Sequence, residues 1–164
     1  MKLFGIVGAS GSGKTTLITG LLREFRRRGL SISTIKHAHH GFDMDRPGKD
    51  SWRHREAGAA QVMVASNNGW ALLQSESTEA ELSPAGLAEH MAAVDLILVE
   101  GFRECDIPRI EVHRPSVGKK PFFPDDAGIR GVASDAFIET YGRPLLQLSD
   151  ISAIADFILE NGVQ

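Results

Sequence analysis

The sequence is poor in cysteine, in aromatic residues and in long hydrophobic runs. Cys105 is the only cysteine among 164 residues, so no internal disulfide forms, as expected of a reducing compartment. The longest apolar run is four residues, for example 96–99, too short for a transmembrane helix or a signal-peptide core. The formal net charge of −3 argues against binding to a nucleic-acid backbone or an anionic membrane. We therefore expect a cytoplasmic protein with neither nucleic acid nor a membrane as its partner.

What the chain does have is the composition of a folded domain. Hydrophobic residues make up 42% of it and charged residues 24%, so disorder is not expected. The length suits a single domain over residues 1–164. Strand-like and helical segments alternate, which predicts a three-layer α/β/α domain with a mostly parallel central sheet. The expected strands of this sheet are 2–7, 31–37, 95–100, 109–113, 129–133 and 144–148.

Capping residues and apolar stripes predict four helices. The first begins near Gly13, ends at Gly29 and carries a stripe formed by Leu17, Ile18, Leu21, Leu22 and Phe25. Ser51 is expected to cap a short helix that runs through Gly58. Ser83 caps the next helix, whose face is formed by Leu87, Met91 and Val94. Asp150 caps the last helix, with Ile151, Ile154 and Ile158 on its face.

An inserted β-hairpin is expected in the middle of the chain. Residues 61–65 and 70–74 are strand-like and flank the turn sequence Ser66-Asn67-Asn68-Gly69. Trp52 and Trp70 fall in this part of the chain, and we interpret both as packing residues rather than platforms for a base.

The strongest motif is Gly8-Ala9-Ser10-Gly11-Ser12-Gly13-Lys14-Thr15, which matches G-x-x-x-x-G-K-[ST] between an expected strand and an expected helix. Glycines allow consecutive backbone N–H groups to converge on phosphate oxygens, and the helix dipole favours the same anion. We expect a P-loop that binds a nucleoside triphosphate, with Lys14 at the β- and γ-phosphates and Thr15 at Mg²⁺. The binding residues are then Gly8, Ser10, Gly11, Ser12, Gly13, Lys14, Thr15 and, at the α-phosphate, Thr16.

A carboxylate near the metal is expected at the end of a neighbouring strand. Asp95 and Glu100 bracket the apolar run, and phosphates bind at the carboxyl ends of strands in such sheets. Glu100 is therefore the candidate for the Mg²⁺ side, acting through a water, whereas Asp95 lies at the opposite edge. The N–H of Gly101 could approach a γ-phosphate. The predicted catalytic residues are thus Lys14 and Glu100. The predicted metal-binding residues are Thr15 and Glu100.

The segment that follows the second expected strand is rich in histidine and aspartate. His37, His39 and His40 could ligate a metal, although no cysteine pair supports a zinc site. A polar loop that contacts phosphates, a Mg²⁺-bound water or a second substrate is the favoured interpretation.

The identity of the base is less clearly encoded. The tetrapeptide Asn-Lys-x-Asp that reads guanine is absent, but Asp135 follows a late strand and could accept hydrogen bonds from N1 and N2 of guanine. Capping of the next turn is an equally good interpretation of Asp135. Arg103 and Arg109 could act as arginine fingers, although ordinary surface charge is the favoured interpretation of both.

Taken in order, these segments resemble one family. Gly8–Thr16, Lys36-His37-Ala38-His39-His40, the run from Asp43 to Ser51, Leu98-Val99-Glu100-Gly101-Phe102 and Val132-Ala133-Ser134-Asp135 are similar to the molybdopterin-guanine dinucleotide biosynthesis protein B (MobB) family. The resemblance implies a homodimeric GTP-binding protein with weak GTPase activity. It also implies a role beside the molybdenum cofactor guanylyltransferase and molybdopterin cofactor, with the 37–45 loop contacting cofactor or partner. Ala38 departs from the hydroxyl-bearing residue expected of many relatives.

Two other functions stay open. A small-molecule kinase could use the same P-loop, but its lid usually carries several arginines, and the 116–128 loop carries none. A metallochaperone GTPase could use the histidines at 37, 39 and 40.

Overall fold

The computed structural model describes residues 1–38, 45–74 and 82–163 and divides the chain into two compact units. The first unit comprises Met1–His37 and Pro84–Gln164, and the second is Ala38–Ser83. The predicted hairpin therefore lies in a unit of its own, inserted between the second and third strands of the main sheet. No helix in the described part of the chain is both long enough and apolar enough to span a membrane.

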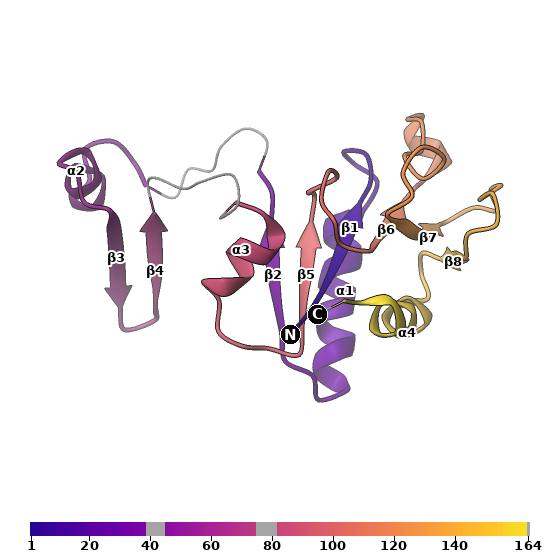
Figure 1. The fold of residues 1–164 in the computed structure, drawn as a ribbon, viewed down its shortest axis with the longest axis horizontal. Coiled ribbons are helices and arrows are strands. Elements are labelled where there is room, and N and C mark those ends of the chain that lie inside the picture. The colour runs from indigo at the N-terminus through magenta and orange to yellow at the C-terminus, as the bar shows by residue number, and fades with distance from the viewer. Residues whose placement is uncertain (39–44, 75–81, 164) are drawn as a thin grey trace. The chain divides into compact units, whose positions relative to one another are not determined.

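A six-stranded sheet, parallel throughout, forms the first unit (Figure 1). Its order is β2-β5-β1-β6-β7-β8, so β5 lies between the first two strands of the chain. The strands are β1 (Lys2–Val7), β2 (Ile32–Lys36), β5 (Leu96–Glu100), β6 (Arg109–Val112), β7 (Ile129–Ser134) and β8 (Leu145–Gln147). Each expected strand is confirmed to within one residue at either end.

Two helices cover one face of this sheet and a third lies on the other. Phe4 and Ile6 of β1 pack with α1 (Lys14–Arg27) and α4 (Ile151–Asn161), which contact each other (Figure 1). Leu3, the alternate neighbour in β1, instead packs in a cluster with Ala88 of α3 (Pro84–Glu89). The 101–108 and 118–128 segments complete this second face, where Phe123 is buried beside Val7.

Helix caps were predicted with mixed success. The Asp150 carboxylate accepts from the Ala153 N–H, as expected of a cap, and Gly162 follows the last residue of α4. Ser51 is not a cap: α2 (Asp50–Glu56) has Lys49 at its N-cap, and the Ser51 hydroxyl donates to Asp45 instead. The helix after Ser83 ends at Glu89, so Met91 and Val94 pack against the core from the segment beyond it.

The second unit contains α2 and the antiparallel hairpin β3 (Gln61–Ser66) and β4 (Gly69–Gln74). Its Ser66–Gly69 pair closes the turn at Asn67-Asn68, as the sequence predicts. Val62 and Leu73, a cross-strand pair, are buried, and α2 contacts β3. Trp70 is 69% exposed, so the interpretation of this side chain as a packing residue is wrong for the described residues.

Candidate functional site

The Gly8–Thr15 loop joins the end of β1 to the start of α1. Gly8, Gly11 and Gly13 have φ of 145°, 80° and 101°, in the left-handed region that favours glycine. At Gly8 a side chain is also excluded by space, because its Cβ would collide with the carbonyl oxygen of Val112 in β6. No Cβ contact restricts Gly11 or Gly13, so backbone conformation alone requires glycine at these two positions.

The amino end of α1 is suited to an anion. Its N-cap residue is Gly13, which has no side chain to accept a hydrogen bond from the first turn. The first turn of α1 contains no acidic residue. The first N–H groups of a helix lack intrahelical acceptors, and the helix dipole makes this end electropositive. A phosphate group supplies the missing acceptors.

The Lys14 side chain folds back over the loop. Its Nζ donates to the carbonyl oxygens of Gly8 and Ala9, at 2.9 Å each. Partial burial lowers the pKa of the Lys14 ammonium, and the nearby Glu100 carboxylate opposes this shift. Lys14 therefore holds the loop closed.

Glu100 meets the loop from the carboxyl end of β5. The Thr15 hydroxyl lies 3.5 Å from Glu100 Oε1, and the Lys36 ammonium lies 3.8 Å from the same oxygen. Two of the predicted residues, Thr15 and Glu100, are thus brought together from positions 85 residues apart. Lys36 was not predicted to join them. It is the register partner of Glu100, and that pairing depends on a strand order that sequence patterns do not reveal.

The remaining predicted loop residues differ in exposure. Ser10, Gly11 and Thr16 are exposed, whereas Ser12 is 1% exposed. The Ser12 hydroxyl is buried and has no hydrogen-bond partner among the described residues. A buried hydroxyl without a partner is costly, so this group is available to a ligand or a water.

Asp95 and Asp135 lie at opposite edges of the sheet. Asp95 accepts from the backbone and hydroxyl of Ser31 before β5 begins, in agreement with its assignment to the amino edge. Asp135 directly follows β7 at the carboxyl edge, and its Oδ2 accepts from Arg114 Nε at 2.7 Å. No helix lies between β7 and β8 for Asp135 to cap, and the local turn is closed by Ser134, whose hydroxyl accepts from Ala136.

The segment that follows Glu100 is held by contacts with β1, with His37 and within the segment itself. Phe102 has φ of 45°, unusual for a residue with a side chain, and its ring lies against His37 with centroids 4.7 Å apart. The Cys105 thiol donates to the Phe102 carbonyl at 2.7 Å. The Gly101 N–H, expected at a γ-phosphate, donates instead to the carbonyl of Ile6 at 3.2 Å.

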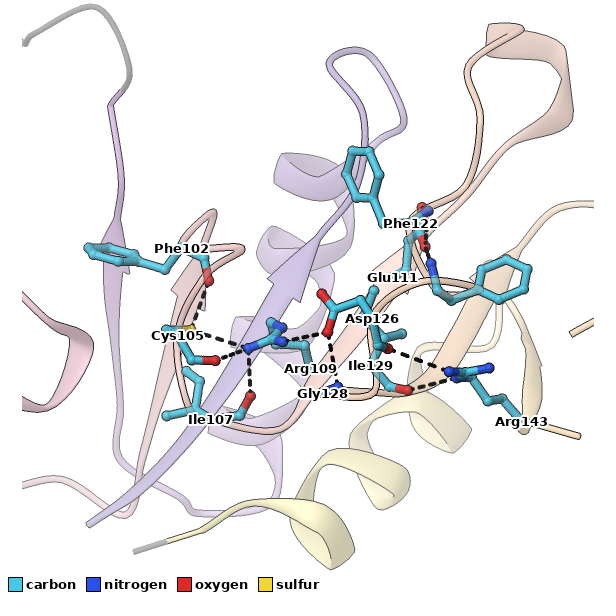
Figure 2. Close-up of polar contacts among 11 residues, drawn as sticks. Phe102, Cys105, Ile107, Arg109, Glu111, Phe122, Asp126, Gly128, Ile129 and Arg143 are labelled. Carbon is cyan, nitrogen blue, oxygen red and sulfur yellow. Dashed lines mark hydrogen bonds and ion pairs between the residues drawn. The ribbon is translucent and has the colours of Figure 1, made fainter. Parts of the chain in front are cut away.

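Arg109 connects this segment to the loop before β7 (Figure 2). Its guanidinium donates to the carbonyls of Cys105 and Ile107 and pairs with Asp126 at 2.7 Å. With 4% exposure, Arg109 is neither an arginine finger nor a surface charge, and both interpretations are wrong. Arg103 is exposed and lies 4.3 Å from the centroid of the Phe122 ring. The buried role of Arg109 has a sequence signal in two glycines, Gly5 and Gly128, which leave room for its side chain.

The metal-site prediction is only partly covered by the structure. His39 and His40 lie outside the described residues. Among residues 1–38, 45–74 and 82–163, no group of three or more metal-binding side chains gathers.

The parallel sheet, the glycine-rich loop that enters α1 and the acidic strand end beside Thr15 define an α/β protein of the P-loop NTPase class. A sequence model of molybdopterin guanine dinucleotide synthesis protein B, MobB, matches residues 3–135. The chain belongs to the MobB family.

Curated relatives and a solved structure agree with this assignment. The molybdopterin-guanine dinucleotide biosynthesis adapter protein of Haemophilus influenzae is 41% identical over 96% of this chain and 88% of its own length. The adapter protein of the same name from Escherichia coli is 41% identical over 98% of this chain and 93% of its own length. A crystal structure of molybdopterin-guanine biosynthesis protein B, 29% identical, superposes with a TM-score of 0.74 over 96% of this chain and 98% of that one.

Proposed function

We propose that this chain is a GTP-binding adapter protein for the biosynthesis of molybdopterin guanine dinucleotide. The convergence of Lys14, Thr15 and Glu100 at the amino end of α1 carries the proposal. The names of the relatives from Haemophilus influenzae and Escherichia coli support the pathway. In this role the protein works beside a molybdenum cofactor guanylyltransferase and molybdopterin cofactor in the cytoplasm, and the hairpin unit is an insertion in a single nucleotide-binding domain.

The residues present fit a triphosphate and Mg²⁺. The open positions at Gly11 and Gly13 leave room for phosphate oxygens, and the Ser12 hydroxyl lacks a partner among the described residues. Oxygen ligands suit Mg²⁺, and Thr15 and Glu100 supply them from two sides. Gly8, Ser10 and Thr16 complete the phosphate-binding set. Lys14 would exchange its bonds to the loop carbonyls for phosphate oxygens, which are stronger partners of an ammonium.

Hydrolysis is expected to be slow. Bound Mg²⁺ would neutralise charge that develops on the phosphates, and Lys14 would stabilise the same charge. Fast GTPases also orient the attacking water with a dedicated side chain, and often supply an arginine. Arg109 is buried in other contacts and does not provide that group. The protein therefore acts mainly as a nucleotide-dependent adapter, with weak GTPase activity.

For the base, we propose that Asp135 accepts from N1 and N2 of guanine. Asp135 lies at the carboxyl edge of the sheet, as does Glu100, and Arg114 holds one oxygen of its carboxylate.

Lys14→Ala tests the proposal at its centre. Loss of the ammonium removes the charge that faces the β- and γ-phosphates, so GTP affinity should fall by roughly 100-fold or more. Isothermal titration with Mg²⁺ and GTP measures this loss, and circular dichroism checks that the fold survives.

Lys119→Ala is the matched control, because it removes the same charge from an exposed loop position. It should leave GTP affinity within about twofold of the native value. GTP affinity unchanged by Lys14→Ala, or ATP bound at least about tenfold more tightly than GTP, would contradict the proposal.

A further inference from the structure

A groove beside α1 continues from the phosphate-binding loop. Its volume is about 470 Å³, within the range of pockets that hold small organic ligands. Its lining comes from the first three turns of α1 and the first residue of α4, namely Thr15, Thr16, Thr19, Gly20, Arg23 and Ile151. Thr15 and Thr16 belong both to the proposed phosphate-binding set and to the lining of the groove, so a ligand whose phosphates lie at Lys14 has this groove directly beside it.

The floor of the groove is apolar and narrow. Gly20 has no side chain, and a Cβ there would lie 3.1 Å from Cδ1 of Ile151. The two residues therefore pack closely, and the absence of a side chain at position 20 keeps the space above them open. The Thr19 hydroxyl is already engaged with the Thr15 carbonyl at 2.8 Å. Such a floor suits a flat ring better than an isolated anion.

Arg23 is the charged group of this groove. It is exposed, and no hydrogen bond or ion pair joins it to another residue in the described part of the chain. Arg27, the last residue of α1, and Arg28, its C-cap, are in contrast both paired with Glu24, at 2.8 and 2.7 Å. Arg23 lines the groove together with Thr15 and Thr16, so its charge adjoins the space beside the phosphate-binding loop.

We propose that this groove takes the guanine nucleoside half of the bound nucleotide and that Arg23 is a specificity-determining residue. A planar guanidinium donates two parallel hydrogen bonds to O6 and N7 of guanine, a pattern that adenine cannot accept because its N6 is a donor. The inference rests on the proposed function, since it requires that triphosphates bind at Lys14. Asp135 contacts N1 and N2 on the other edge of the base, so the two residues read different atoms.

Arg23→Ala, with Arg26→Ala as its matched control, tests the assignment. Both residues are exposed arginines on α1, but only Arg23 lines the groove. Titration of each variant with Mg²⁺ and GTP, or Mg²⁺ and ATP, should show GTP affinity about tenfold weaker in Arg23→Ala. ATP affinity should change by no more than about twofold, and Arg26→Ala should bind both nucleotides like the native protein.

Modified bases identify the atoms that are read. 7-Deaza-GTP lacks the N7 acceptor, so the native protein should bind it about fivefold more weakly than GTP, and Arg23→Ala should bind the two equally. Inosine triphosphate lacks the 2-amino group that Asp135 is proposed to contact. The penalty for inosine triphosphate should therefore persist in Arg23→Ala.

Gly20→Ala provides an independent measurement on the floor of the groove. The added methyl group should weaken GTP and ATP alike, by about threefold or more, and leave the affinity for inorganic triphosphate unchanged. The assignment is overturned if Arg23→Ala keeps the full preference for GTP over ATP. It is also overturned if the native protein binds 7-deaza-GTP as tightly as GTP. Neither result would argue against triphosphate binding at Lys14. Failure of the native protein to bind any triphosphate overturns the proposed function and this inference together.

Discussion

Arg109 places a charge in the interior of the sheet, and two glycines make room for it. The side chain crosses β1 at Gly5 and reaches Gly128, where any Cβ would collide with the guanidinium. Its donors are divided between the 101–108 segment and Asp126, as Figure 2 shows. Buried charges are retained only when paired, so Arg109, Asp126 and the two glycines form one structural unit.

Gly5→Ala should destabilise the protein through this unit. The new Cβ would lie 2.5 Å from Cγ of Arg109, and such overpacking costs about 2 kcal/mol. Urea unfolding followed by circular dichroism measures the loss. In an Arg109→Ala background, itself destabilised by about 3–5 kcal/mol, the added cost of Gly5→Ala should fall by at least about 1 kcal/mol.

Asp126→Asn is the matched background, because it removes the ion pair but keeps the Arg109 side chain beside position 5. In this background Gly5→Ala should lower the free energy of unfolding by as much as in the native protein. Equal costs in the Arg109→Ala and native backgrounds would show that the arginine is not what excludes a side chain at position 5.

At the scale of elements, the 118–128 segment is attached to β6 by Arg109 at its end and by the buried carboxylate of Glu111 near its middle. Glu111 is 1% exposed and accepts from the N–H groups of Phe122 and Phe123 at 2.7–3.0 Å. Burial raises the pKa of Glu111 above its ordinary value of 4.5, and the backbone hydrogen bonds oppose this shift less strongly. The contribution of Glu111 to the free energy of unfolding should therefore depend on pH.

The sign of that dependence follows from the raised pKa. The fold favours the protonated form, so the contribution of Glu111 to the free energy of unfolding is complete below pH 4.5. It is lost as pH rises through the higher pKa of the folded protein, because the carboxyl group then ionises in a buried position that disfavours its charge. Glu111→Gln cannot ionise, so the stability advantage of the native protein over this variant should shrink between pH 4 and pH 8, roughly the range in which carboxylates with raised pKa titrate.

Urea midpoints measured across that pH range give the difference. Glu104→Gln changes an exposed glutamate nearby and should differ from the native protein by a constant amount. A difference between native protein and Glu111→Gln that grows with pH would contradict the raised pKa.

Local signals predicted the elements of this fold better than they predicted how the elements meet. The glycine-rich motif located both the end of β1 and the start of α1, and Asp150 located the start of α4. Lys49 at the start of α2 escaped prediction because its backbone alone forms the cap. The pairing of Lys36 with Glu100 was equally hidden, because parallel strands find partners through tertiary packing and not through adjacency in sequence.

At the scale of the whole molecule, the hairpin unit presents an apolar face. Met63 pairs across the strands with Leu72, and Ala65 with Trp70, so alternation places all four on one side of the sheet. Met63, Trp70 and Leu72 are 62%, 69% and 40% exposed. A two-stranded sheet is marginally stable alone, and a large exposed apolar patch marks an interaction site. We propose that a second copy of this chain covers the face, in the homodimer that the family resemblance implies.

The double substitution Trp70→Thr with Leu72→Thr should separate the two copies. Threonine retains the preference for a strand but removes most of the apolar area, and a buried tryptophan is a common centre of binding energy. Sedimentation equilibrium should give a dimer for the native chain and a dissociation constant at least about tenfold larger for the variant.

Val64→Thr, on the opposite side of the same strand pair, is the control and should leave the dimer intact. GTP affinity per chain should not change, because Lys14, Thr15 and Glu100 all belong to the other unit. A native chain that remains monomeric at tens of micromolar, or a variant that dimerises as tightly as the native chain, would remove the second copy as the partner of this face.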